Sequence, residues 1–307
     1  MTDSSLEAPS LAFGPSERAS AERLVAAALA EDLGEAGDVT SRALIAEGDM
    51  GRVKVIARQA GVLAGEPVAR MVFERIDPRV EWRTLIADGM AIEAGSVVAE
   101  LAGPVRSLLT GERTALNFLT HLSGMASLAR QYVDAVAGTS ATIFDTRKTL
   151  PGWRAMQKYA VRAGGGTNHR IGLYDAVLIK DNHLAACERR GVGDASIAAA
   201  VRHARDAAPQ GMVIEVEVDT LEQLEDALAG APDIVLLDNM PLDTLREAVR
   251  LRDARSPGVL LEASGGVNRA TVRAIAETGV ERISIGALTH SAPATDLAFD
   301  WEPRPPA

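Results

Sequence analysis

The stretch VIEVEVDTLEQLEDALAGAPDIVLLDN (213–239) decides the fold class. Its two ends, 213–220 and 233–239, are short runs of Val, Ile and Leu that finish in acidic side chains, a pattern typical of buried strands. The middle, 220–230, spaces its leucines three and four residues apart, which predicts a helix with one apolar face. A strand, a helix and a second strand in this order predict two parallel strands of one sheet.

The same alternation extends to both sides of this stretch. The other strand candidates are ATIFDT (141–146), AVLIKDN (176–182), VLLEASGG (259–266) and ERISIG (281–286). The other helical spacers are 196–208, 242–254 and 269–279, and a longer helix is predicted over 114–137. The array predicts an α/β fold built on a parallel sheet or barrel.

The beginning of the chain has a different pattern. A helix is predicted over 16–33, and short strand-like runs separated by Gly and Asp-Gly turns follow it. We therefore expect an N-terminal α+β domain over residues 1–115 and a barrel domain over 116–290. The C-terminal tail, 291–307, is expected to pack back on the first domain.

The bulk composition excludes several classes of protein. The 307 residues carry a formal charge of −10, whereas nucleic-acid and membrane-surface binding both need a basic face. No apolar run reaches the ~18 residues of a membrane span, and the first residues lack the apolar core of a signal peptide. The single Cys187 excludes an internal disulfide and a cysteine zinc site. We expect a cytoplasmic protein with small-molecule ligands and neither nucleic acid nor membrane as a partner.

Acidic side chains alternate along one strand of the array. Glu215, Glu217 and Asp219 share a face, and we expect them to point into the barrel because the apolar face packs on the outer helices. Three inward acids repel one another unless a cation offsets them. Glu217 with Asp238 of the next strand is predicted to hold Mg²⁺. An internal ion pair with Lys180 is the alternative, and the two can coexist.

A basic set lies among these acids and consists of Arg147, Lys148, His169, Arg170 and Lys180. In a net acidic protein, cations at strand ends predict an anionic ligand, and Arg suits bidentate capture of carboxylates. A solvated surface set is the plainer alternative. Because barrel active sites gather at the carboxyl ends of the strands, the acids and bases together predict one shared site.

Small residues follow the last two strand candidates. Ser264, Gly265 and Gly266 come after one strand, and GALTH (286–290) comes after the other. Such turns let backbone N–H groups approach a phosphate, and barrels often bind phosphate at this place. Plain left-handed turns are the alternative.

Several long runs resemble the quinolinate phosphoribosyltransferases, which are type II phosphoribosyltransferases. They cover nearly the whole chain in family order: EDLGEAGDVTS (31–41), GERTALNFLTHLSGMAS (111–127), DTRKTLPGWRAMQKYAVRAGGGTNHRIGLYDAVLIKDNH (145–183), EVEVDTLEQL (215–224), IVLLDNM (234–240), LEASGGV (261–267) and ISIGALTHS (283–291). The chain departs from the family's usual KTTPGL at Leu150 and Trp153, away from any expected ligand, and carries a charged insertion near 187–194.

The resemblance implies an N-terminal α/β domain, an open α/β barrel and a homodimer with a shared active site. Arg113 would then reach quinolinate in the neighbouring subunit, although its position alone indicates only the start of a helix. The implied quinolinate pocket consists of Arg113, Arg147, Lys148, His169, Arg170 and Lys180. Glu217 and Asp238 would face the Mg²⁺-bound phosphoribosyl group, and phosphate would be held by Ser264, Gly265, Gly266, Gly286 and His290.

The implied reaction converts quinolinate and phosphoribosyl pyrophosphate into nicotinate mononucleotide, pyrophosphate and CO₂, a step of NAD biosynthesis. Lys148, Lys180, Glu217 and Asp238 would be its catalytic residues. Three rivals remain: a paralogue encoded in molybdenum operons, a barrel aldolase with Lys180 as a Schiff base, and a barrel that only binds a small anion. Three arginines beside two acids favour the transferase.

Overall fold

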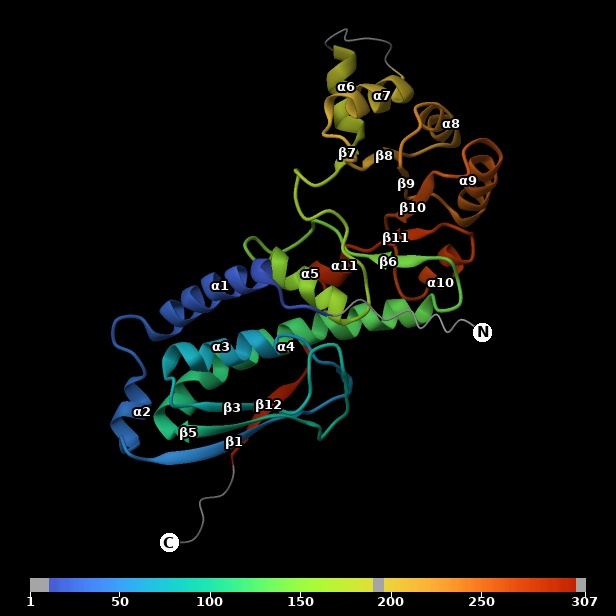
Figure 1. The fold of residues 1–307 in the computed structure, drawn as a ribbon. Coiled ribbons are helices and arrows are strands. Elements are labelled where there is room, and N and C mark those ends of the chain that lie inside the picture. The colour runs from blue at the N-terminus through green and yellow to red at the C-terminus, as the bar shows by residue number, and fades with distance from the viewer. Residues whose placement is uncertain (1–10, 190–195, 302–307) are drawn as a thin grey trace, which may run out of the picture. The chain divides into compact units, whose positions relative to one another are not determined.

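The computed structural model describes residues 11–189 and 196–301 and divides them between two compact units (Figure 1). The first unit takes its described residues from Met1–Arg130, Thr149–Gly165 and Leu288–Ala307. The second unit takes its described residues from Gln131–Lys148 and Gly166–Ala287. Most of the charged insertion predicted near 187–194 lies outside the described residues.

The first unit is an α+β structure. Its elements are α1 (Pro15–Leu33), α2 (Val39–Leu44), β1 (Met50–Ala57), β2 (Gly61–Val62), α3 (Glu66–Ile76), β3 (Glu81–Thr84), β4 (Ala91–Ile92), β5 (Val97–Pro104), most of α4 (Val105–Ala135), α5 (Arg154–Ala163), most of α11 (Ala287–His290) and β12 (Leu297–Trp301). The main sheet has the order β12-β1-β5-β3, and its neighbours are antiparallel. β12 brings part of the predicted C-terminal tail into this sheet, with Val55 opposite Phe299.

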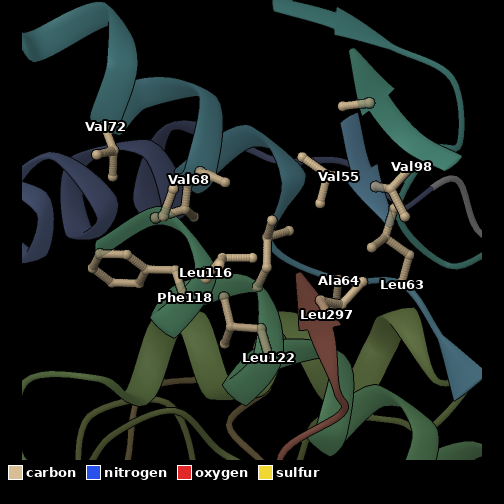
Figure 2. Packing of buried hydrophobic residues seen from close by; sticks show 14 of the residues in the cluster. Val55, Leu63, Ala64, Val68, Val72, Val98, Leu116, Phe118, Leu122 and Leu297 are labelled. Atoms are coloured by element: carbon tan, nitrogen blue, oxygen red, sulfur yellow. The ribbon is translucent and has the colours of Figure 1, made fainter. Parts of the chain in front are cut away.

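One hydrophobic core holds the first unit together. Alternate residues of β1 are buried, so the sheet presents one apolar face. Figure 2 shows side chains from this sheet gathered with those of two helices: Val55, Val98 and Leu297 with Val68 and Val72 of α3 and Leu116, Phe118 and Leu122 of α4. At ~25 cal/mol per Å² of apolar area removed from water, this core is the main stabilising term of the unit.

The predicted domain boundary at residues 115 and 116 differs from the division that the structure shows. α4 runs without a break across this position, and it begins at Val105 rather than near residue 114. Its Gly111 lies against Phe73 of α3, where an added Cβ would come within 2.5 Å of the ring. α5 contributes Met156 and Ala160 to the same core. Residues 116–130 and 149–165 therefore belong to the first unit because their apolar faces are buried there.

The second unit is an array of strands and helices. Its elements are β6 (Thr142–Phe144), β7 (Val177–Ile179), α6 (Asp181–Arg189), α7 (Ile197–Ala207), β8 (Ile214–Val218), α8 (Leu221–Ala229), β9 (Ile234–Asp238), α9 (Leu242–Arg255), β10 (Leu260–Ser264), α10 (Val272–Ala276) and β11 (Arg282–Ser284). Side-chain caps begin two of the helices: Ser196 accepts a hydrogen bond from the N–H of Ala199, and Thr220 accepts one from Gln223.

The strands of the second unit form a parallel sheet in the order β6-β11-β10-β9-β8-β7. The helices α7, α8 and α9 pack on one another in turn beside it (Figure 1). Strands β8 and β9 are buried along most of their length, as expected when helices cover a sheet. In the described residues no pairing joins the end strands β6 and β7, so the barrel is open. The predicted fold, an open α/β barrel with an N-terminal sheet domain, is confirmed.

The 31-residue α4 is the longest helix described, and neither it nor any other described helix is apolar enough to cross a membrane.

Candidate active site

A cavity of about 420 Å³ opens at the carboxyl ends of the parallel strands in the second unit. Its lining consists of Thr146, Arg147, Lys148, His169, Arg170, Leu178, Lys180, Glu217, Leu236, Asp238, Glu262, Ser264 and Ser284. Every strand of the sheet therefore contributes a residue from its own carboxyl end or from the loop that follows. Charged side chains of both signs are concentrated here, as the unequal distribution of polar residues along the strands predicts.

Most of the predicted site residues line this cavity: Arg147, Lys148, His169, Arg170, Lys180, Glu217, Asp238 and Ser264. Gly265 and Gly266 follow Ser264 directly and have φ angles of 89° and 60°, a left-handed conformation that glycine adopts without strain. Gly286 follows β11 in the same unit. Arg113 and His290 belong to the first unit, and the structure does not group them with this cavity.

The register of the sheet explains why these side chains meet. Ser264 lies opposite Asp238, and Glu262 lies opposite Leu236, which in turn faces Glu217 on the other side. The polar positions thus fall at two successive levels of three neighbouring strands, Glu217 and Glu262 at one and Asp238 and Ser264 at the next. Asp219 was expected to point inward with Glu217, but it is exposed because β8 ends at Val218 and the chain turns into α8.

Lys180 and Glu217 form an ion pair in the cavity. The Lys180 ammonium donates to a Glu217 carboxylate oxygen, with 41% and 18% of the two side chains exposed. The internal ion pair weighed as an alternative from the sequence is therefore present. Both partners line the same open cavity, so each remains accessible to a ligand.

Arg170 lies beside a second guanidinium, that of Arg147. Burial lowers the pKa of Arg170, and the positive charge of Arg147 lowers it further. The Arg170 side chain is held in place by a 3.2 Å hydrogen bond from Nη1 to the carbonyl of Ala176. Two like charges held together in a cavity predict an anionic ligand that relieves their repulsion.

A buried cluster of His169, Glu215 and Glu262 lies beside the cavity. His169 Nε2 is 3.1 Å from Glu215 Oε2 and 3.3 Å from Glu262 Oε1, and their ligand atoms lie within 4.8 Å of one another. Arg282 balances part of the negative charge, because its Nε donates to Glu262 Oε2 at 2.7 Å. A metal would have to compete with this internal balance, so the cluster is better described as an ion-pair network.

The protonation state of His169 depends on the partners of both ring nitrogens. Burial disfavours the imidazolium, but hydrogen bonds and attraction from Glu215 and Glu262 outweigh burial and raise its pKa to about 9. The backbone N–H of Arg170 donates to Nδ1 at 2.8 Å and opposes this shift, because that nitrogen accepts only when it is unprotonated. With Nδ1 accepting from this N–H, Nε2 is the nitrogen that donates to the carboxylates. His169 therefore lines the cavity with both nitrogens already engaged.

From the sequence, Glu215 was expected to point inward, but neither it nor Glu262 was given a ligand or catalytic role. Glu215 and Glu262 are 1% and 0% exposed, and burial raises the pKa of Glu215 while His169 and Arg282 keep that of Glu262 low against burial. The period of two along β8 and β10 is a signal for both, since it places Glu215 on the face of Glu217 and Glu262 on that of Ser264.

Asp145 supports the loop that carries His169. The Asp145 side chain is fully buried and accepts hydrogen bonds from the His169 N–H at 2.9 Å and from Asn168 Nδ2 at 2.6 Å. It is not among the residues that line the cavity. Its contribution is to fix the loop.

Arg113 lines a separate cavity of about 280 Å³ within the first unit. Trp153 and Phe118 lie in the same wall, and their rings stack with centroids 5.1 Å apart. The departure from the family pattern at Trp153 thus lies beside a predicted site residue rather than away from the site residues. His290 Nδ1 lies 2.7 Å from Ser291 Oγ, and the two atoms form a hydrogen bond.

Comparisons with known proteins agree with this geometry. A model of the C-terminal domain of quinolinate phosphoribosyl transferase matches residues 125–300, and a model of its N-terminal domain matches residues 38–123. The nicotinate-nucleotide pyrophosphorylase (carboxylating) of Mycobacterium leprae is 46% identical over 89% of this chain and 94% of its own length. The probable enzyme of the same name from Bacillus subtilis is 42% identical over 88% and 89%.

Solved structures give the same result. The nicotinate-nucleotide pyrophosphorylase from Francisella tularensis superposes with a TM-score of 0.84 and 40% identity, covering 92% of this chain and 96% of that one.

Proposed function

Since the chain belongs to the quinolinate phosphoribosyltransferase family, we propose that it converts quinolinate and phosphoribosyl pyrophosphate into nicotinate mononucleotide, pyrophosphate and CO₂. This reaction supplies the pyridine ring of NAD. The observation that carries the proposal is the cavity of the second unit, which brings two arginines and two lysines together with three carboxylates.

The basic part of the cavity suits quinolinate. The substrate has two adjacent carboxylates, and the neighbouring guanidinium groups of Arg147 and Arg170 provide planar, paired donors for them. Lys148 and Lys180 add point charges to the same wall. His169 takes part by supporting this wall, because its Nδ1 holds the backbone of Arg170.

In the first chemical step, the ring nitrogen of quinolinate forms a bond to the anomeric carbon of the ribose. The bond from that carbon to pyrophosphate breaks, and the electron pair leaves with the pyrophosphate. The transition state carries positive charge on the ribose. Glu217 and Asp238 stabilise this charge through their carboxylates, and the loop of Ser264, Gly265 and Gly266 binds phosphate through backbone N–H groups.

In the second step, the bond between ring carbon 2 and its carboxylate breaks and CO₂ leaves. The electron pair stays on carbon 2, next to the positively charged ring nitrogen, and a proton then adds to that carbon. Lys148 and Lys180 stabilise the negative charge through their ammonium groups.

The donors Glu217 and Asp238 fit Mg²⁺, which prefers hard oxygen ligands and usually combines one or two carboxylates with phosphate oxygens and water. When bound, Mg²⁺ would neutralise charge on the departing pyrophosphate. The ion pair with Lys180 leaves Glu217 accessible at the cavity surface.

We extend the proposal to a cytoplasmic homodimer with a shared site. Arg113 is its trans-acting residue, and its placement in a cavity of the first unit is compatible with a ligand from a second subunit. Gly286 and His290 complete the phosphate-binding set in this proposal.

The rival activities are less consistent with the site. A Schiff-base lysine is normally activated by an apolar pocket or a neighbouring cation, whereas Lys180 is paired with Glu217. The relatives named above are all described as pyrophosphorylases, which disfavours both a paralogue of other chemistry and a simple anion binder.

The direct test incubates the purified chain with quinolinate, phosphoribosyl pyrophosphate and Mg²⁺ and follows nicotinate mononucleotide by chromatography. The proposal predicts product only when both substrates are present. Borohydride treatment with a keto acid is the matched test of the aldolase, and the proposal predicts no covalent adduct at Lys180.

A further inference from the structure

Asn239, which follows β9, adopts an unusual backbone conformation. Its φ is 53°, and it is one of two non-glycine residues with positive φ in the described part of the chain. Asn tolerates this left-handed region better than most side chains, but a glycine would adopt it with less strain. The side chain at this position is therefore expected to have a use that offsets the backbone cost.

The contacts of Asn239 connect two parts of the cavity. Its backbone N–H donates to the carbonyl of Ser264 at 2.9 Å. Its side-chain Nδ2 donates to Asp238 Oδ2 at 2.7 Å. Asp238 and Ser264 both line the cavity and lie opposite each other in the sheet, so one residue is bonded to both.

The same side chain covers the backbone of Gly265. A Cβ added to Gly265 would lie 2.2 Å from Asn239 Oδ1 and 2.5 Å from its Cγ. The glycine turn at 265 and 266 is thus packed against the amide that also binds Asp238. Movement of the Asn239 side chain would change the orientation of the carboxylate and remove the support of the turn.

We propose that Asn239 is a positioning residue that sets the Asp238 carboxylate and the Ser264–Gly265–Gly266 turn in one fixed arrangement for the phosphoribosyl substrate. The inference rests on the proposed function for the identity of that substrate. The cations that suit quinolinate, Arg147 and Arg170, are not among the contacts of Asn239 described above. Loss of the Asn239 side chain should therefore weaken the binding of phosphoribosyl pyrophosphate and leave that of quinolinate largely unchanged.

The experiment compares Asn239→Gly with Ala231→Gly. Glycine keeps the positive φ and the backbone N–H at position 239, so the change removes only the side chain. Ala231, with a φ of 54°, is the other non-glycine residue in this conformation and lies before β9, at the opposite end of the strand from the cavity. It controls for the relief of backbone strain.

Binding of each substrate is measured by calorimetry, together with the KM of each and the unfolding midpoint. Asn239→Gly should raise the Kd and KM for phosphoribosyl pyrophosphate about tenfold, a loss of about 1.4 kcal/mol, with those for quinolinate changed less than about twofold. Asn239→Asp keeps the shape of the side chain but places a carboxylate beside Asp238. This variant should bind phosphoribosyl pyrophosphate more weakly still. Ala231→Gly should bind both substrates as the unmodified protein does.

Equal binding of phosphoribosyl pyrophosphate by Asn239→Gly and the unmodified chain would overturn the inference. Equal weakening of both substrates, or a loss explained by a lower unfolding midpoint, would also overturn it, because either result indicates a general structural role. The proposed function fails separately, if the unmodified chain neither binds nor converts the two substrates.

Discussion

His169 Nε2 lies 3.1 Å from Glu215 Oε2, and this contact joins the loop between α5 and β7 to strand β8 of the parallel sheet. The opposite edge of the imidazole accepts the backbone N–H of Arg170. Glu215 therefore influences the position of Arg170 indirectly, through the His169 ring, which has a hydrogen-bond partner on each edge. Arg282 continues the network through Glu262 and lies 3.6 Å from the centre of the Phe144 ring.

The first prediction concerns stability against pH. The pKa of folded His169 is raised to about 9, above the ~6.5 of an unfolded chain. A raised folded pKa adds stability that is fully present below about pH 6.5 and disappears as pH rises through about 9. The difference in unfolding free energy between the unmodified chain and His169→Gln should shrink over that window by at most about 3 kcal/mol, because the Arg170 N–H opposes protonation.

Urea denaturation at a series of pH values measures this difference. The exposed His203 on α7 provides the control, since His203→Gln removes an imidazole from the same unit without touching Glu215, Glu262, Arg282 or Asp145. A difference for His169→Gln that stays constant over the window would mean that the ring remains neutral throughout.

The second prediction concerns substrate selectivity. Arg147→Ala and Arg170→Ala should each weaken the binding of quinolinate by ~2–5 kcal/mol, because each leaves a carboxylate of the substrate without its desolvated partner. The KM for phosphoribosyl pyrophosphate should change far less. Arg246→Ala, which breaks an exposed ion pair with Asp243, is the control. It should change neither quinolinate binding nor the KM for phosphoribosyl pyrophosphate.

Nicotinic acid tests the same wall from the side of the ligand. It lacks the 2-carboxylate, so binding it leaves cations unpaired, and it should be a very poor substrate. Turnover of nicotinic acid at the rate of quinolinate would show that the basic side chains of the cavity do not recognise two carboxylates.

The third prediction concerns the metal. Activity should require Mg²⁺ or Mn²⁺ and should disappear in excess chelator. Glu217→Ala combined with Asp238→Ala should lose turnover of phosphoribosyl pyrophosphate, whereas Asp243→Ala, at a carboxylate that is 97% exposed, should not. Full activity in chelator would remove the metal from the proposal, and calorimetry with MgCl₂ and phosphoribosyl pyrophosphate checks whether the ion and the substrate bind together.

The fourth prediction concerns the shared site. Arg113→Ala and Lys180→Ala chains should each be nearly inactive alone. Co-folded in equal amounts they should recover roughly a quarter of the unmodified activity, because about half of the dimers are mixed and each mixed dimer has one intact site of two. Mixing that restores nothing, with subunit exchange confirmed by native mass spectrometry, would place Arg113 outside the partner's site.

The sequence predicts the second unit better than the first. All six strands of its sheet lie within the predicted runs, because buried parallel strands are apolar throughout and are interrupted by amphipathic helices. In the first unit α3 and α5 were not predicted. α3 begins within a Gly-Glu-Pro sequence (65–67), and a Pro-Gly turn lies before α5. Both stretches are typical of loops when the core they complete is not known.

The site follows the same rule. Side chains at strand ends, such as Lys180 and Asp238, were predicted because their chemistry contrasts with the apolar strand before them. Glu215 was predicted to point inward, but neither it nor Glu262 was given a role, since their roles depend on His169, whose position is set by a loop rather than by strand alternation. Asp219 was misplaced by continuing the period of two beyond the residue where β8 ends.

The most direct measurement of the central claim uses quinolinate labelled in its 2-carboxylate. The purified chain, with phosphoribosyl pyrophosphate and Mg²⁺, should release labelled CO₂ and form nicotinate mononucleotide and pyrophosphate in equal amounts, and Arg147→Ala should reduce all three together. Release of no labelled CO₂ under conditions where both substrates bind, or formation of a nucleotide that retains the label, would contradict the account.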